Sequence, residues 1–258
     1  MDDMKYLIAN YKMHCTRRES TALARGVLRA VEGIAHAPYV VLCPSFPSLV
    51  DVQKVIAKTP VMLGAQNVAS TAGGAMTGEV SALQLKDAGC AYVLVGHSER
   101  RQTLGETSDT VREKILQAFA VGVTPILCVG ETKTERDAGK AEAVVADQIS
   151  TAFRDVAIPR SERLIVAYEP VWAIGDGDAA TPADVVGMHQ HIRRILTPIA
   201  GEAEMTLLYG GSVDGQDARS FLCERDIDGV LVGGASITLQ EFLLVMQSAA
   251  EVMQSQNI

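Results

Sequence analysis

A carboxylate stands at the head of a segment that is suited to cover a reactive site. Glu169 follows the apolar run LIVAY and is followed at once by Pro170 and then by Trp172, the only tryptophan of the chain. A glycine-rich tip comes next, and a stiff start with a free tip is typical of lids that keep intermediates from water. A glutamate before proline is often only a solvated turn residue. Here the pattern favours a general base beside a lid over residues 167–177.

A histidine and a lysine follow two other apolar runs. His97 comes after AYVLVG and directly before SER, so its ring is expected at the start of a helix. The helix dipole there disfavours the imidazolium and favours a neutral ring that donates a hydrogen bond. Taken alone, such a histidine is more often a packed or capping residue, and Lys12 could be a plain surface charge. Together with Glu169, His97 indicates an acid–base pair, and Lys12 indicates a cation that steadies an anionic substrate.

Two glycine-rich turns are suited to bind phosphate. One of them, YGGS, ends at Ser212, and the other contains Gly233 and Gly234. Glycine lets the backbone approach an anion, and a helix that starts there supplies free N–H groups. Each turn by itself more often makes only a tight bend. Together they predict a phosphate cradle.

The elements that must position these residues form an alternating series. Helix-like segments, among them 18–34, 81–89, 109–122 and 181–196, lie between apolar runs of the kind found in strands covered on both faces. The series predicts an α/β fold, a single (β/α)8 barrel with one domain over residues 1–258. An open doubly wound sheet is the alternative. The eight apolar runs begin at residues 5, 39, 61, 91, 124, 163, 205 and 229.

In a barrel of this kind the chemistry lies where the strands end. The expected strand ends carry Asn10 and Lys12 on the first strand, His97 on the fourth and Glu169 on the sixth. The two glycine turns follow the seventh and eighth strands. The barrel would therefore gather a lysine, a histidine, a carboxylate and a phosphate cradle on one face.

The composition argues against several classes of protein. Hydrophobic residues make up 48% of the 258 residues, enough for a sizeable core, and the formal net charge is −8. No run rich in Lys and Arg offsets that charge, so nucleic acid is not an expected partner. No apolar stretch has the length of a transmembrane helix, so a membrane is not expected either, and the first residues lack the features of a signal peptide.

Metal and disulfide chemistry are also not expected. The five cysteines are scattered and form no CxxC pair, so buried thiols are the favoured interpretation for Cys43, Cys90 and Cys128. His189 and His191 would point to different faces of a helix and are poorly spaced for a metal. These features fit a reducing cytoplasm best.

Eight stretches, in this order and spacing, are highly specific. They are ANYKM (9–13), AQN (65–67), TGEVS (77–81), VGHSERR (95–101), ILCVGET (126–132), AYEPVWAIG (167–175), YGGSV (209–213) and GVLVGGAS (229–236). Through them the chain resembles the triosephosphate isomerase family along nearly its whole length. The resemblance implies a homodimeric barrel that interconverts dihydroxyacetone phosphate and glyceraldehyde 3-phosphate in glycolysis and gluconeogenesis. It also implies that the enzyme needs no metal or organic cofactor.

The resemblance implies roles for single residues as well. Glu169 matches the base that moves a proton between adjacent carbons, and His97 matches the electrophile that polarises the carbonyl. Lys12 and Asn10 match substrate-binding positions. Further matches are the supporting carboxylate Glu99, the phosphate-binding amides of Gly175, Ser212, Gly233 and Gly234, the buried Cys128, and Thr77 at the tip of a loop that enters the neighbouring subunit.

Two positions in the predicted lid depart from the family. Asp176 and Asp178 stand where Thr and Lys are usual, and their charge would oppose closure over a dianion. They motivate a second hypothesis, an isomerase of a related small phosphosugar such as a tetrulose phosphate. A third hypothesis, a barrel that has lost catalysis, is disfavoured by the presence of Lys12, His97 and Glu169.

Overall fold

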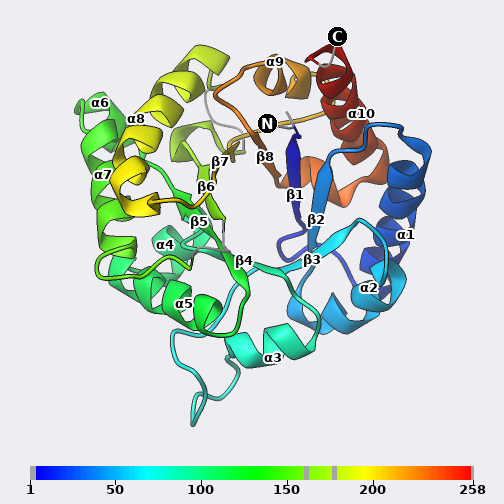
Figure 1. Ribbon diagram of the computed structural model, residues 1–258, viewed down its shortest axis with the longest axis horizontal. Helices are drawn as coiled ribbons and strands as arrows, with labels where there is room; N and C mark the ends of the chain where they lie inside the picture. Colours follow the sequence, from blue (N-terminus) through cyan, green and yellow to red (C-terminus); the bar gives the residue numbers. More distant parts are fainter. Residues whose placement is uncertain (1–3, 160–162, 176–178, 257–258) are drawn as a thin grey trace.

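Eight parallel strands close into a barrel in the computed structural model, which describes residues 4–159, 163–175 and 179–256. Each strand pairs with the next along the chain, and β8 pairs with β1 (Figure 1). The predicted barrel is confirmed and the open sheet is excluded. The strands are β1 (Tyr6–Asn10), β2 (Tyr39–Cys43), β3 (Met62–Ala65), β4 (Tyr92–Val95), β5 (Thr124–Val129), β6 (Leu164–Tyr168), β7 (Met205–Tyr209) and β8 (Gly229–Val232).

Successive residues of each strand face opposite sides of the barrel wall. On β1, Leu7 and Ala9 belong to a large cluster that also contains helix residues, whereas Ile8 belongs to a smaller cluster built from strand residues alone. The smaller cluster fills the barrel interior, and the larger one joins the wall to the helices. Because both faces are buried, the strands have the continuous apolar sequence expected of them.

Helices form a ring outside the barrel (Figure 1). The four expected helical segments are confirmed as α1, α3, α5 and α8, and Thr16 and Thr181 cap α1 and α8 through reciprocal bonds with the third residue of each helix. Within the described ranges the α-helices are α1 (Arg17–Gly33), α2 (Leu49–Ile56), α3 (Ala82–Asp87), α4 (Ser98–Leu104), α5 (Ser108–Ala120), α6 (Lys133–Asp137), α7 (Ala141–Ala152), α8 (Pro182–Ala200), α9 (Ala218–Leu222) and α10 (Leu239–Gln256). Short 3-10 helices are η1 (Phe46–Ser48), η2 (Val171–Ala173) and η3 (Gly234–Ile237).

The loop between β3 and α3 extends away from the barrel (Figure 1). Residues 71–79 of this loop are all exposed, and a hydrogen bond of 2.8 Å from the Ala69 amide to the Val80 carbonyl closes its base. Thr77 lies in this exposed part, as expected. Among the helices of the described residues, none combines the length and the apolar character that crossing a membrane requires.

Candidate active site

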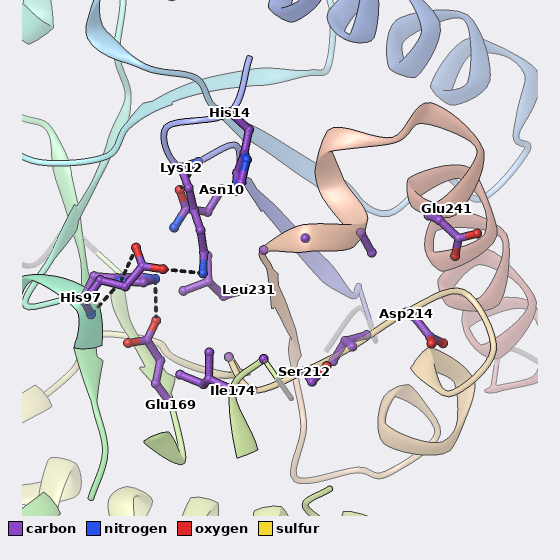
Figure 2. Close-up of a pocket in the computed structure, with 18 residues that line it drawn as sticks. Asn10, Lys12, His14, His97, Glu169, Ile174, Ser212, Asp214, Leu231 and Glu241 are labelled. Carbon is purple, nitrogen blue, oxygen red and sulfur yellow. Dashed lines mark hydrogen bonds and ion pairs between the residues drawn. The ribbon is translucent and has the colours of Figure 1, made fainter. Parts of the chain in front are cut away.

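A cavity of about 600 Å³ lies at the carboxyl ends of the barrel strands. Every site residue expected from the sequence lines it (Figure 2), although these residues follow five different strands. The structure therefore brings together the groups that the strand ends were predicted to gather. They are Asn10, Lys12, His97, Glu99, Glu169, Gly175, Ser212, Gly233 and Gly234.

Glu169 is the first residue after β6, and it is only 1% exposed. Its amide donates a hydrogen bond of 2.7 Å to the Val129 carbonyl at the end of β5. Two glycines leave room for it. A Cβ on Gly210 would lie 2.9 Å from the Glu169 Cγ, and a Cβ on Gly130 would lie 1.8 Å from the Glu169 carbonyl oxygen. Any larger residue at these positions would displace the glutamate.

The two carboxylate oxygens of Glu169 have different surroundings. Oε2 accepts a hydrogen bond of 2.7 Å from the backbone N–H of Ser98, the first residue of α4. Oε1 lies 3.2 Å from Nε2 of His97 (Figure 2). The two atoms are close but not aligned as a hydrogen bond, and Oε1 has no hydrogen-bond partner among the described residues. This oxygen is therefore free to take a proton.

His97 caps the start of α4, as predicted from the residues SER that follow it. Its Nδ1 accepts a hydrogen bond of 3.3 Å from the backbone N–H of Glu99. A ring nitrogen that accepts a hydrogen bond carries no proton, so this contact selects the neutral ring with its proton on Nε2. The Nε2–H group faces Glu169, where it can donate to an oxygen of a bound molecule.

Lys12 has a backbone conformation that is uncommon for a lysine, with φ at 49°. The Asn10 Oδ1 accepts the Lys12 N–H at 3.0 Å, and the Gln66 Nε2 donates to the Lys12 carbonyl at 2.8 Å. These bonds hold the strained turn that directs the side chain across the cavity. Asn10 therefore helps to position the side chain of Lys12.

The ammonium group of Lys12 is paired with Glu99. Nζ donates a hydrogen bond of 2.6 Å to Oε1 of Glu99. Burial raises the pKa of the Glu99 carboxyl, but the hydrogen bond and charge of Lys12 outweigh burial and hold the pKa below its ordinary value. The carboxylate is thus ionised at neutral pH and keeps the lysine charge at the edge of the cavity.

Both glycine turns line the same cavity as Lys12 and Glu99. Gly234 begins η3, and the first N–H groups of a helix have no acceptor within it. Gly233 lies close to Lys12, since a Cβ there would be 3.1 Å from the lysine Cε. One expected donor is not free in this structure, because the Ser212 amide donates a 3.0 Å hydrogen bond to the Ala173 carbonyl. Ser212 would have to release that carbonyl to bind phosphate.

The sequence did not single out Glu131, which is fully buried beside the site. Its Oε1 accepts hydrogen bonds from Nε1 of Trp172 at 2.7 Å and from the hydroxyl of Tyr168 at 3.0 Å. Its place in the stretch ILCVGET was the only signal, and no chemistry pointed to it. The cavity is also lined by Asp214 and Glu241, which the sequence did not mark either.

Two further predictions have different outcomes. Cys128 is completely buried, as expected, and burial together with the Glu169 carboxylate raises the pKa of its thiol well above the ordinary value. The lid is described only as far as Gly175. Asp176 and Asp178 lie outside the described residues, so their effect on closure stays a prediction.

Comparison with known proteins identifies the family to which the chain is similar. The model of the family described as "Triosephosphate isomerase" matches residues 5–249. The chain is 46% identical over 243 residues to the triosephosphate isomerase of Roseiflexus castenholzii, covering 93% of this chain and 95% of that protein. It is 44% identical to the triosephosphate isomerase of Chloroflexus aurantiacus, and the match covers 93% of this chain and 97% of that protein. It is 43% identical over 249 residues to the triosephosphate isomerase of Thiobacillus denitrificans, and the match covers 96% of this chain and 99% of that protein.

Proposed function

The chain belongs to the triosephosphate isomerase family and is an isomerase of dihydroxyacetone phosphate and D-glyceraldehyde 3-phosphate, and we propose that Glu169, His97 and Lys12 carry this reaction. The observation that supports this assignment most strongly is the pairing of Glu169 with His97. Glu169 Oε1, which has no hydrogen bond within the described part of the chain, faces a neutral imidazole across 3.2 Å, at the edge of one cavity.

The reaction moves a proton between two adjacent carbons of the substrate. Glu169 takes the proton from the hydroxyl-bearing carbon next to the carbonyl, which leaves an enediolate, and then returns it to the former carbonyl carbon. The hydroxyl proton passes to the former carbonyl oxygen, so no proton is gained or lost overall. The Nε2–H of His97 donates to the oxygen on which negative charge develops. Triosephosphate isomerase is itself the standard example of a neutral histidine that acts as an electrophile beside a carboxylate base.

The remaining groups bind the substrate. Lys12 steadies its negative charge, Asn10 supports the turn that carries Lys12, and Glu99 keeps the ammonium in place. The phosphate is bound by the backbone amides of Gly233 and Gly234 in the second glycine turn, of Gly175 in the lid, and of Ser212 once it has released the Ala173 carbonyl. Phosphate lies away from the reacting carbons, so its binding energy can serve to orient the substrate for proton transfer.

The proposed enzyme acts as a homodimer through the loop around Thr77. Met13 is 96% exposed and Met76 is 45% exposed, although both are large apolar side chains. Met76 precedes Thr77 in the extended loop, and Met13 follows the catalytic Lys12. Burial of such residues against a second copy would remove apolar surface from water and would support the turn that carries the lysine.

The proposed setting is the reducing cytoplasm, where the enzyme serves glycolysis and gluconeogenesis. Free thiols support a reducing compartment, since all five cysteines are unpaired. Cys15 is half-buried and Cys223 is exposed.

Steady-state rates on three- and four-carbon phosphosugars test the substrate. We expect kcat/KM to be highest for glyceraldehyde 3-phosphate. A clear preference for a tetrose or tetrulose phosphate would contradict the three-carbon assignment and would make Asp176 and Asp178 the first residues to exchange.

A further inference from the structure

Trp172 is held by an arginine that is not part of the cavity. The guanidinium carbon of Arg136, on α6, lies 4.0 Å from the centre of the Trp172 ring. This is a cation–π contact, in which the arginine covers the face of the ring. Nε1 of the same ring donates to Glu131, so the tryptophan is fixed both at its face and at its edge.

The same guanidinium also binds the helix that follows the lid. Nη2 of Arg136 donates a 2.7 Å hydrogen bond to Oδ1 of Asp184 in the first turn of α8, and α6 and α8 lie side by side in Figure 1. The hydrogen bond from the Thr181 hydroxyl, and then Arg136, hold the pKa of Asp184 below its ordinary value. Asp184 is therefore ionised, and it accepts hydrogen bonds both from the cap residue Thr181 and from Arg136.

Arg136 has a third contact, on the side of the barrel. Its Nη1 lies 3.7 Å from Oε1 of Glu131, whose carboxylate is completely buried. The backbone of Glu131 also accepts the Val171 N–H at 3.1 Å. One side chain thus joins the loop after β5, the start of the lid at Trp172, and the start of α8 beyond the lid.

We propose that Arg136 is a positioning residue for the segment 170–175, which is anchored through Trp172. This segment begins directly after Glu169 and ends at Gly175, so its placement sets both the base and one of the phosphate-binding amides. A planar guanidinium can stack on a ring and bond to two carboxylates together, which a lysine ammonium cannot do. The consequence for catalysis rests on the proposed function, whereas the anchoring of Trp172 does not.

The test uses Trp172 as its own reporter, because it is the only tryptophan of the chain. Fluorescence emission, its response to inorganic phosphate, and kcat and KM are measured for wild type, Arg136→Met and Arg136→Lys. Arg154→Met is the matched control, since it removes another arginine from an exposed ion pair, with Asp109. We expect Arg136→Met to shift the emission, to weaken phosphate binding about tenfold, and to raise KM more than it lowers kcat. In Arg136→Lys each of these quantities should change less than in Arg136→Met, but it should still differ from the wild type. Arg154→Met should leave all of them unchanged.

The outcomes separate the two proposals. Unchanged emission and phosphate response in Arg136→Met would overturn the positioning role, and a loss of thermal stability alone would do the same. Wild-type protein that binds phosphate but fails to turn over triose phosphate would instead overturn the proposed function. In that case the emission of the variants would still decide whether Arg136 positions Trp172.

Discussion

Nε2 of His97 and Oε1 of Glu169 lie 3.2 Å apart at the ends of β4 and β6. Each of the two groups has a second contact. That of His97 fixes which ring nitrogen carries the proton, and that of Glu169 fixes the position of the carboxylate. Nδ1 of His97 accepts an N–H, so the proton is on Nε2, and Oε2 of Glu169 is held by the Ser98 amide. The free Oε1 and the Nε2–H therefore face each other as a proton acceptor and a hydrogen-bond donor. A bound substrate could accept the Nε2–H at its carbonyl oxygen and give the proton of the adjacent carbon to Oε1, which are the two interactions that an enolisation needs.

Shortening the base is the first prediction. Glu169→Asp withdraws the carboxylate by about one carbon–carbon bond, and a misplacement of about 1 Å can cost about a hundredfold in rate. We expect a loss of about that size in kcat, with little change in KM. Glu32→Asp, on the exposed face of α1, is the control in the same steady-state assay. A loss confined to KM would contradict the role of Glu169 as base.

Gly210 provides a second test that leaves the carboxylate itself intact. A Cβ there would lie 2.9 Å from the Glu169 Cγ, so Gly210→Ala must shift the glutamate side chain. We expect kcat to fall at least tenfold, that is by about 1.4 kcal/mol in transition-state stabilisation, while the protein stays folded.

Gly187→Ala is the matched control for this glycine exchange. A Cβ at Gly187, within α8, would meet no atom within 4 Å. Alanine is the better helix former, so this variant should be about 0.5–1 kcal/mol more stable and fully active. Equal activities of the two variants would show that Glu169 does not depend on the space left at Gly210.

The barrel and the placement of its site could be predicted because both follow from local patterns. Uninterrupted apolar runs mark strands that are covered on both faces, and residues directly after such strands must meet at one end of a barrel. His97 at a helix start was likewise predictable from SER alone. The backbone conformation of Lys12 and the buried carboxylate of Glu131 were not, because each depends on partners far away in the chain, such as Gln66 and Trp172.

A buried histidine predicts how stability changes with pH. Burial lowers the pKa of His189 from 6.5 to about 4, while its Nδ1 contacts the Asp226 carbonyl at 2.8 Å. The unfolded chain binds the proton more readily, so the contribution of His189 is complete above pH 6.5 and is lost as the pH falls toward 4. We expect protonation of this one group to lower the free energy of unfolding by about 3 kcal/mol between pH 6.5 and pH 4.

Urea unfolding at several pH values and a fixed protein concentration measures this effect. His189→Asn keeps a donor near the Asp226 carbonyl but does not titrate, so its stability should vary less between pH 6.5 and 4. His36→Asn, at an exposed position, should keep the wild-type dependence. Equal slopes for wild type and His189→Asn would rule out His189 as the source.

The proposed dimer makes a prediction for Met13. Because this side chain is 96% exposed, an aspartate there costs the single subunit little, but it would place a charge in the apolar contact with a second copy. Light scattering at micromolar concentration should show a dimer for wild type and a monomer for Met13→Asp. Ala143→Asp, on the exposed face of α7, should remain a dimer. A monomeric wild type would contradict the dimer, and a dimeric Met13→Asp would exclude Met13 from its interface.

The central claim is that Glu169 is the base of a triose phosphate isomerisation. A coupled assay of glyceraldehyde 3-phosphate turnover, on purified wild type and on Glu169→Gln, tests it most directly. We predict fast turnover by the wild type and its near-complete loss in Glu169→Gln, whose amide has a similar shape but cannot take the proton. Turnover that survives in Glu169→Gln would contradict the account.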